Sequence, residues 1–346
     1  MKCEILIIGG SISGLATAFE LTRKGCAPII IDRKNEIGNP VQCAEYVPAL
    51  FSTNTDTFTS AIANRVDGLE THIIDYKNNI DKDFMKQNGY ILDRDRWEKT
   101  LAMEILKNGG RLFLSEPMVN MEFGTDTITV ETRKRIFSCR IVVGADGPQS
   151  LTAMFARMHT QKLMPAIQWL LPTKYEIDRN YVLFKPEIVA GYGWLFPKGD
   201  MANVGLAGWG VSRKKLKNVI DYFADFIFPT PIAITGGLIP VYGVREKIVN
   251  NTGKSGVILV GDAAGFTDPI TGAGIVSAFE TGTLAAEVIS EFLEGKIDTL
   301  DVYSQRTKFL RSALERSRKK RINMENNWNN EAEFTQIIRK NWIHSR

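Results

Sequence analysis

Three short apolar runs divide the chain, and each of them ends at small or polar residues. They cover residues 3–8, 27–31 and 256–260 and are rich in isoleucine and valine. Short runs of this kind, bounded by turn residues, are typical of strands buried in a parallel sheet. After the first and the third run, apolar residues recur at helical spacing, over 15–25 and 276–293. The pattern therefore predicts strands that alternate with helices.

The middle of the chain has a different pattern, in which apolar and aromatic residues alternate with others. This alternation predicts antiparallel strands. The expected strands cover residues 166–175, 181–184, 191–196 and 203–209. An amphipathic pattern behind them predicts a single helix over 212–228.

Shorter elements fill the rest of the chain. We expect two strands around a charged turn, then a helix that ends at Gly109-Gly110, a small β-meander, a buried strand and, at the end, helices rich in charge. The two strands are 69–75 and 89–93, around the charged turn 77–83, and the helix is 94–107. The meander comprises 111–114, 128–131 and 136–141, the buried strand is 141–143, and the C-terminal helices lie in 298–346.

The composition is that of an ordinary globular protein. Of 346 residues, 44% are hydrophobic and 24% are charged. The formal net charge of +4 is too small to favour nucleic acid as a partner. No run approaches 18 apolar residues, and the first apolar run leads directly into a glycine turn, as a core strand does and a signal peptide does not. We therefore expect a cytoplasmic protein without a membrane span.

The cysteines and histidines predict no metal site. The four cysteines are Cys3, Cys26, Cys43 and Cys139, and the three histidines are His72, His159 and His344. The cysteines are widely spaced and form no CxxC pair, which argues against structural zinc and against a secreted disulfide scaffold.

The first turn has the residues of a nucleotide-binding motif. It reads GGSISG at 9–14, between a predicted strand and a predicted helix. Gly9 permits a tight turn and Gly14 close packing of helix against strand, while the helix N-terminus offers N–H groups to a pyrophosphate. Asp32 follows the second strand at the distance expected of a ribose-binding acid. Ser11 departs from the usual glycine, and its side chain changes the approach to phosphate without excluding binding.

A loop and an aromatic stretch carry further candidate chemistry. The loop reads PVQCAE at 40–45, and its Cys43 is either a buried small hydrophobe or a group that faces a cofactor ring. Five aromatic residues of the middle region suit both the wall of an apolar pocket and the core between a sheet and its helix. They are Trp169, Tyr192, Trp194, Phe196 and Trp209.

Three motifs occur in a fixed order: GGSISG with Asp32, then GADG at 144–147, then GDAA at 261–264. Together they resemble the FAD-dependent oxidoreductases of the para-hydroxybenzoate hydroxylase fold. PVQCAE at 40–45 and GYGWLFPK at 191–198 are similar to the loop and the YxWxFPK signature of the geranylgeranyl reductase family. The signature also resembles, more distantly, a tryptophan motif of flavin halogenases.

The resemblance implies an α/β fold with a Rossmann-like FAD-binding domain, an inserted antiparallel β-sheet substrate domain and a helical C-terminus. The expected FAD-binding domain comprises 1–65, 91–160 and 246–297, the substrate domain 66–90 and 161–245, and the C-terminal segment 298–346. The residues that would bind FAD are Gly9, Ser11, Ser13, Gly14, Asp32, Arg33, Cys43, Ala44, Arg94, Asp262, Gly274 and Ile275. Tyr192, Trp194 and Phe196 would face the substrate.

Members of this family reduce isolated C=C bonds of polyprenyl chains. The resemblance therefore implies a hydrophobic isoprenoid substrate, with the flavin as the source of hydride. An alkene that is being protonated develops positive charge, so we expect Cys43 or Glu45 near the ring as catalytic residues. The sequence has no second glycine motif for a nicotinamide, which leaves ferredoxin or NAD(P)H as an external electron donor.

Two points stay open at this level. Flavin monooxygenases and halogenases share the three cofactor motifs, and a flavin-bearing binding protein without turnover is a further alternative. The basic stretch at 311–321 suits a solvated helix face, and it also suits contact with anionic lipid, which the implied substrate would favour.

Overall fold

The structure, a computed structural model, describes residues 1–51 and 56–342. His344 lies outside the described residues. The chain forms two compact units. Unit 1 comprises Met1–Asn39, Asp95–Lys162 and Pro240–Glu315, and unit 2 comprises Pro40–Arg94, Leu163–Ile239 and Arg316–Arg346.

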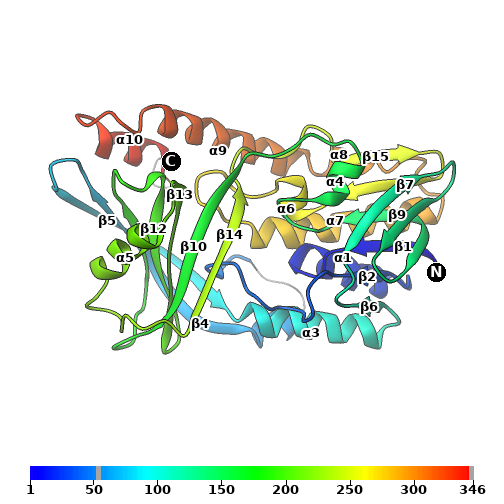
Figure 1. The fold of residues 1–346 in the computed structure, drawn as a ribbon, viewed down its shortest axis with the longest axis horizontal. Helices are drawn as coiled ribbons and strands as arrows, with labels where there is room; N and C mark the ends of the chain where they lie inside the picture. Colours follow the sequence, from blue (N-terminus) through cyan, green and yellow to red (C-terminus); the bar gives the residue numbers. More distant parts are fainter. Residues whose placement is uncertain (52–55, 343–346) are drawn as a thin grey trace. The chain divides into compact units, whose positions relative to one another are not determined.

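Unit 1 is built on a mainly parallel sheet (Figure 1). Its strands are β1 (Lys2–Ile8), β2 (Ile29–Ile31), β6 (Arg111–Phe113), β7 (Met118–Phe123), β8 (Ile128–Thr132), β9 (Ile136–Gly144), β15 (Val249–Thr252) and β16 (Ser255–Leu259). The order β16-β9-β1-β2-β6 is parallel throughout, with Ile7 of β1 paired to both Ile30 and Val143. The strands β15, β8 and β7 are added antiparallel. The apolar runs form the buried centre of this sheet, as the pattern predicts.

Unit 1 also contains helices, several of which follow its parallel strands. They are α1 (Ile12–Arg23), α3 (Arg94–Lys107), α4 (Leu151–Phe155), α6 (Gly261–Ala264), α7 (Ile275–Leu293) and α8 (Val302–Arg306), and α9 (Lys308–Asn326) begins in unit 1. The backbones of α1 and α7 pack closely, because a Cβ atom on Gly282 would lie 2.5 Å from Ser13 O. The Rossmann-like expectation is therefore confirmed for the fold.

Unit 2 is built on an eight-stranded sheet of order β14-β10-β13-β12-β11-β4-β5-β3. Its strands are β3 (Tyr46–Pro48), β4 (Ile62–Ile74), β5 (Ile80–Leu92), β10 (Leu163–Pro172), β11 (Asn180–Phe184), β12 (Val189–Lys198), β13 (Met201–Trp209) and β14 (Ala233–Pro240). The pair β11 and β4 is parallel, whereas β10, β13, β12 and β11 are antiparallel neighbours. The expected antiparallel sheet is thus present.

One face of this sheet is covered by α5 (Arg213–Tyr222), as Figure 1 shows. Leu195, Val204 and Leu206 of the strands form a core with Leu216 and Val219 of the helix. Side chains alternate along a strand, so Trp194 of β12 and Asn203 of β13 project from the opposite face. Unit 2 also contains α2 (Asp56–Thr59) and α10 (Phe334–Asn341).

Several predicted boundaries were wrong, and two of them have a clear physical reason. The helix expected over 212–228 ends at Tyr222, because the chain then turns back to the sheet, where Phe226 O accepts from Lys174 N and Phe228 N donates to Pro172 O. The charged turn expected at 77–83 is mostly strand, since β4 and β5 pair as far as Ile74 and Ile80. The pairing partner outweighs the low strand propensity of charged residues.

The compact units divide the chain differently from the expected domains. Residues 40–51 pack in unit 2, although we expected them in the FAD-binding domain, and α8 packs in unit 1. The functional boundaries stay a prediction. No helix in the described part of the chain combines the length and apolar character that crossing a membrane requires.

Candidate functional site

The turn between β1 and α1 has no room for side chains at its two key glycines. Gly9 has φ 109°, and a Cβ atom there would lie 2.2 Å from Ala145 O. A Cβ atom on Gly14 would lie 2.0 Å from Gly9 O. The GADG motif, which contains Ala145, therefore packs directly against the first turn. Both glycines are required by the backbone itself.

Asp32 holds this turn from the end of β2. The carboxylate is 5% exposed and accepts from Gly10 N at 2.7 Å and from Lys34 N at 2.8 Å. Two backbone donors leave acceptor capacity on a carboxylate, so Asp32 can still bind a ribose hydroxyl. Arg33, beside it, is exposed.

The two serines of the turn have different surroundings. Ser11 Oγ donates to Glu98 Oε1 at 2.9 Å, and Glu98 on α3 is 2% exposed. The departure from glycine at residue 11 is thus matched by a buried carboxylate acceptor. Ser13 is buried beside Gly261, whose Cβ atom would lie 2.8 Å from it.

The GDAA motif reaches the same region of unit 1. Asp262 Oδ1 accepts from Thr267 Oγ1 at 2.6 Å, and a Cβ atom on Gly274 would lie 3.2 Å from that oxygen. Gly274 is the N-cap of α7, and Ile275 is its buried first residue. With Ser13 next to Gly261, the unit 1 residues predicted to bind cofactor lie together, and Arg33 is an exposed neighbour.

These residues fit a flavin nucleotide. The first turn of α1 has no side-chain cap, so its backbone N–H groups are available to an anion. The glycine backbone of the turn lies close to the start of α1. The carboxylate of Asp32 and the N-terminus of α7 are nearby. Asp146 has a structural role instead: it accepts from Ser150 Oγ at 2.6 Å and Thr152 N at 2.9 Å, and burial raises the pKa of its carboxyl.

The loop of unit 2 that contains Cys43 is tightly bonded. Cys43 Sγ accepts from Glu45 N at 3.2 Å. Glu45 is 2% exposed and has φ 67°, a conformation that residues other than glycine adopt at a cost of roughly 1 kcal/mol. A strained backbone beside a candidate reactive group is typical of functional sites.

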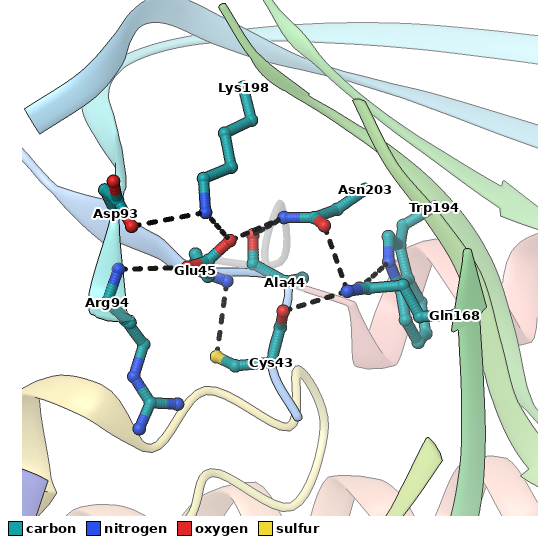
Figure 2. A network of polar contacts seen from close by, with 9 residues as sticks. All are labelled: Cys43, Ala44, Glu45, Asp93, Arg94, Gln168, Trp194, Lys198 and Asn203. Carbon is teal, nitrogen blue, oxygen red and sulfur yellow. Dashed lines mark hydrogen bonds and ion pairs between the residues drawn. The ribbon is translucent and has the colours of Figure 1, made fainter. Parts of the chain in front are cut away.

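The Glu45 carboxylate accepts hydrogen bonds from three donors of unit 2, as Figure 2 shows. Its Oε2 accepts from Lys198 Nζ at 2.7 Å and from Asn203 Nδ2 at 3.0 Å, and its Oε1 accepts from Arg94 N at 3.0 Å. Asp93 lies 3.8 Å from the same lysine. The structure thus brings Cys43, Ala44, Glu45 and the backbone of Arg94 together.

Two functional candidates were missed by sequence reasoning. Gln168 Nε2 donates to Cys43 O at 3.0 Å, and Asn203 Nδ2 lies 3.4 Å from Ala44 O (Figure 2). Both are polar residues at alternating positions in apolar strands, a pattern that also fits a solvated face. Their burial, 8% and 2% exposed, is what distinguishes them.

The three signature aromatics share one face of β12 but differ in surroundings. Trp194 is 7% exposed, and its Nε1 donates to Gln168 Oε1 at 3.0 Å. Tyr192 packs edge-on against Trp342, with ring centroids 5.1 Å apart. Phe196 packs edge-on against Tyr46 at 6.0 Å. Burial raises the pKa of the Tyr46 phenol to about 12, so this group stays protonated near neutral pH.

The basic stretch at 311–321 does not form a single solvated face. Arg321 is 2% exposed, and its Nη2 donates to Ala190 O at 2.6 Å. Arg311 Nη2 donates to Glu246 O at 3.2 Å. Arg316 and Lys319 are exposed. The stretch therefore combines structural and solvent-facing cations.

Curated proteins with similar sequences are named as reductases of a lipid. Digeranylgeranylglycerophospholipid reductase 2 of Methanosphaera stadtmanae is 32% identical over 321 residues, which cover 85% of this chain and 79% of that protein. The corresponding reductase of Methanococcus aeolicus is 30% identical over 311 residues, covering 84% and 77%. A family model described as an NAD(P)-binding Rossmann-like domain matches residues 7–75.

Solved structures share the fold over nearly the whole chain. A geranylgeranyl bacteriochlorophyll reductase-like protein from Thermoplasma acidophilum has a TM-score of 0.76 at 23% identity and covers 99% of this chain and 96% of its own. A probable FAD-dependent monooxygenase from Pseudomonas aeruginosa has a TM-score of 0.74 at 14% identity, covering 97% and 99%. These likenesses show that the chain shares its fold with these proteins.

Proposed function

Because the chain belongs to the geranylgeranyl reductase family of FAD-dependent oxidoreductases, we propose that it saturates C=C bonds of a geranylgeranyl-type chain on a lipid, with FAD as cofactor. The main support is the 32% identity to a named lipid reductase over 79% of that protein's length. Monooxygenases and halogenases are not favoured, since they share the fold at only 13–14% identity.

FAD is proposed on the fit of the unit 1 residues. The α1 N-terminus would bind the pyrophosphate, Asp32 a ribose, and the region of Asp262 and Gly274 further polar groups of the cofactor. A bound flavin would supply the hydride equivalent for the reduction. The electron donor is proposed to be external, either reduced ferredoxin or NAD(P)H.

The unit 2 residues are proposed to act on the substrate side. Cys43 is proposed at the reacting centre, where its thiol would hold or transfer a proton. Glu45 stays in the proposed site as a carboxylate that holds the loop. Tyr192, Trp194 and Phe196 are proposed to face the isoprenoid, with electron-rich rings that stabilise positive charge developing on the alkene.

The test is anaerobic turnover. The purified protein is reduced with dithionite and mixed with a digeranylgeranylglycerol phospholipid, and the product is weighed by mass spectrometry. We expect a gain of about two mass units for each double bond reduced. Rapid oxygen consumption with an oxygenated product in air, and no anaerobic gain, would contradict the proposal and support a monooxygenase.

Cys43 is tested in the same assay by a serine variant. Cys43→Ser keeps the size and the hydrogen-bonding capacity of the side chain but replaces the acidic thiol by a hydroxyl. A drop in kcat of about tenfold or more is expected if the thiol handles a proton. Full turnover in the serine variant would remove Cys43 from this role.

A further inference from the structure

The aromatic signature and the Cys43 loop are joined by a chain of polar side chains in unit 2. We propose that Trp194 is a positioning residue, whose indole N–H starts a hydrogen-bond chain that fixes the peptide carbonyls of Cys43 and Ala44. This polar chain consists of Trp194, Gln168, Asn203, Glu45 and Lys198 (Figure 2). The inference rests on the proposed function, which places Cys43 at the reacting centre, and adds to it how the loop is held.

The first hydrogen bond of the polar chain depends on the space left by Gly205. Gly205 of β13 pairs with Trp194 on one side and with Gln168 on the other. A Cβ atom on Gly205 would lie 2.4 Å from Trp194 Cζ2. The indole can therefore lie across β13 and reach Gln168 Oε1 at 3.0 Å. With any side chain at residue 205, Trp194 could not keep this position.

The donor at the start sets the direction of every following bond. An indole nitrogen only donates, so the atom of Gln168 that faces Trp194 is the amide oxygen. The amide nitrogen of Gln168 then faces Cys43 O and Asn203 Oδ1, both at 3.0 Å. Asn203 Oδ1 is thus an acceptor, and its amide nitrogen is directed at Glu45 Oε2.

The polar chain ends at the carboxylate of Glu45, which accepts hydrogen bonds. Asn203 and Lys198 both donate to Glu45 Oε2, and the Arg94 backbone donates to Oε1. These bonds to both carboxylate oxygens make Glu45 an anchor of the loop.

The loop needs such an anchor. Glu45 has φ 67°, which is unfavourable for its side chain, and the conformation persists only if its surroundings hold it. The polar chain bonds Cys43 O and comes within 3.4 Å of Ala44 O, so two successive peptide groups are held from the sheet. A buried network of this kind rigidifies its site when every member is satisfied.

The first test compares two tryptophans of the same sheet. Trp194→Phe removes the starting donor and leaves an aromatic ring. Trp169→Phe is the matched control, because Trp169 lies next to Gln168 on β10 and its buried indole nitrogen has no hydrogen-bond partner among the described residues. We measure amide hydrogen exchange of Glu45 and Arg94, and the alkylation rate of Cys43, in flavin-free protein.

The two variants should behave differently. Loss of one neutral hydrogen bond from the chain should speed exchange at Glu45 and Arg94, and alkylation of Cys43, by roughly tenfold in Trp194→Phe, equivalent to about 1.4 kcal/mol. Trp169→Phe should leave all three rates near wild type. Equal rates in wild type and Trp194→Phe, or equal acceleration by both variants, would overturn the proposal.

Substitutions at two further residues test the far end of the polar chain and guard against a loss of packing. Asn203→Asp keeps the shape but places a second carboxylate 3.0 Å from Glu45 Oε2, so loop exchange should rise more than in Trp194→Phe. Lys198→Met should also loosen the loop, and Lys198→Arg should restore most of its protection by keeping the charge. If Lys198→Arg restored no protection and Asn203→Asp left the exchange of the loop unchanged, the proposed polar chain would be contradicted.

Turnover measured with the FAD-bound enzyme separates this inference from the proposed function. Trp194→Phe should lower kcat by about tenfold through the loosened loop, with little change in KM, because phenylalanine keeps an aromatic ring on the side proposed to face the isoprenoid. A wild-type protein that reduces no prenyl lipid, with the exchange and alkylation results as expected, would defeat the proposed function and leave the anchoring of the loop supported. The opposite combination would defeat only the anchoring.

Discussion

At the scale of single residues, the nucleotide-binding turn depends on a position where a methyl group has no space. Gly9 combines φ 109° with a carbonyl oxygen 2.2 Å from the place of a Cβ atom. Gly25 offers a matched control, because its φ is 79° but nothing lies within 4 Å of its Cβ position. A comparison of substitutions at the two glycines therefore separates the cost of backbone strain from the cost of a steric clash.

Gly9→Ala should cost more stability than Gly25→Ala. Strain alone costs about 1–2 kcal/mol, and Gly9→Ala adds a clash with backbone that cannot move freely. Urea denaturation of both variants measures the difference, and retention of flavin after gel filtration measures the effect on the turn. Equal losses of stability, with flavin retained in both, would contradict the close approach of Gly9 and Ala145.

A buried histidine in unit 2 gives stability a dependence on pH. Burial lowers the pKa of His72 below its ordinary value of 6.5, although the hydrogen bond to Glu70 acts in the opposite direction. Its two ring nitrogens lie 2.7 Å from Glu70 Oε1 and 2.8 Å from Tyr222 Oη. The folded state therefore prefers the neutral ring.

Stability should fall as the pH drops below about 6.5. In this range the unfolded chain binds a proton that the folded chain resists, so the free energy of unfolding decreases until the lower, folded pKa is passed. Urea denaturation at pH 7.5 and 5.5 checks this for wild type. His72→Gln should reduce the difference between the two pH values. A larger difference in His72→Gln would mean that the Glu70 bond dominates.

At the scale of elements, the last described residues close a face of the unit 2 sheet. Trp342 follows α10, is 2% exposed, and packs edge-on against Phe184 of β11 and Tyr192 of β12. Its Nε1 lies 3.3 Å from Thr71 Oγ1 of β4. One side chain thus connects the C-terminal helix to three neighbouring strands.

Trp342→Ala should destabilise unit 2 by about 3 kcal/mol, because it empties a buried site of aromatic size. Phe309→Ala is the control, since Phe309 on α9 is 78% exposed and should change stability by less than about 0.5 kcal/mol. Chemical denaturation measures both. Similar small effects in the two variants would show that Trp342 is not packed as described.

Elements with a strong local pattern were predictable, and elements fixed by a partner were not. β1, α1, β16 and α7 follow from apolar runs bounded by glycine. The end of α5 at Tyr222 is set by pairing of the following residues with the sheet, and β14 gains its place only by pairing with β10. Neither partner is visible in a local sequence window.

The candidate site divides in the same way. Gly9, Gly14 and Asp32 could be predicted because their chemistry lies within one short motif. Gln168 and Asn203 could not, since they reach the Cys43 loop from strands more than a hundred residues away along the chain. Residues of this kind are identified by burial and by the direction of a hydrogen bond, which only the fold supplies.

At the scale of the whole molecule, the proposed cofactor should contribute to stability. A ligand that binds only the folded chain stabilises it by about 2.7 kcal/mol at a concentration one hundred times its Kd. For a chain of 346 residues this corresponds to a rise in Tm of a few degrees. The unit 1 residues are proposed to hold the adenosine and pyrophosphate part, so this part should supply much of the effect.

FAD should therefore raise the Tm of flavin-free protein, and riboflavin at the same concentration should raise it far less, because riboflavin lacks the groups that the α1 N-terminus and Asp32 would bind. Thermal unfolding followed by circular dichroism measures both shifts. In Gly9→Ala the response to FAD should fall to that of riboflavin. An equal rise with the two flavins would mean that the glycine turn contributes little to binding, and the assignment of the unit 1 residues to the cofactor would then be wrong.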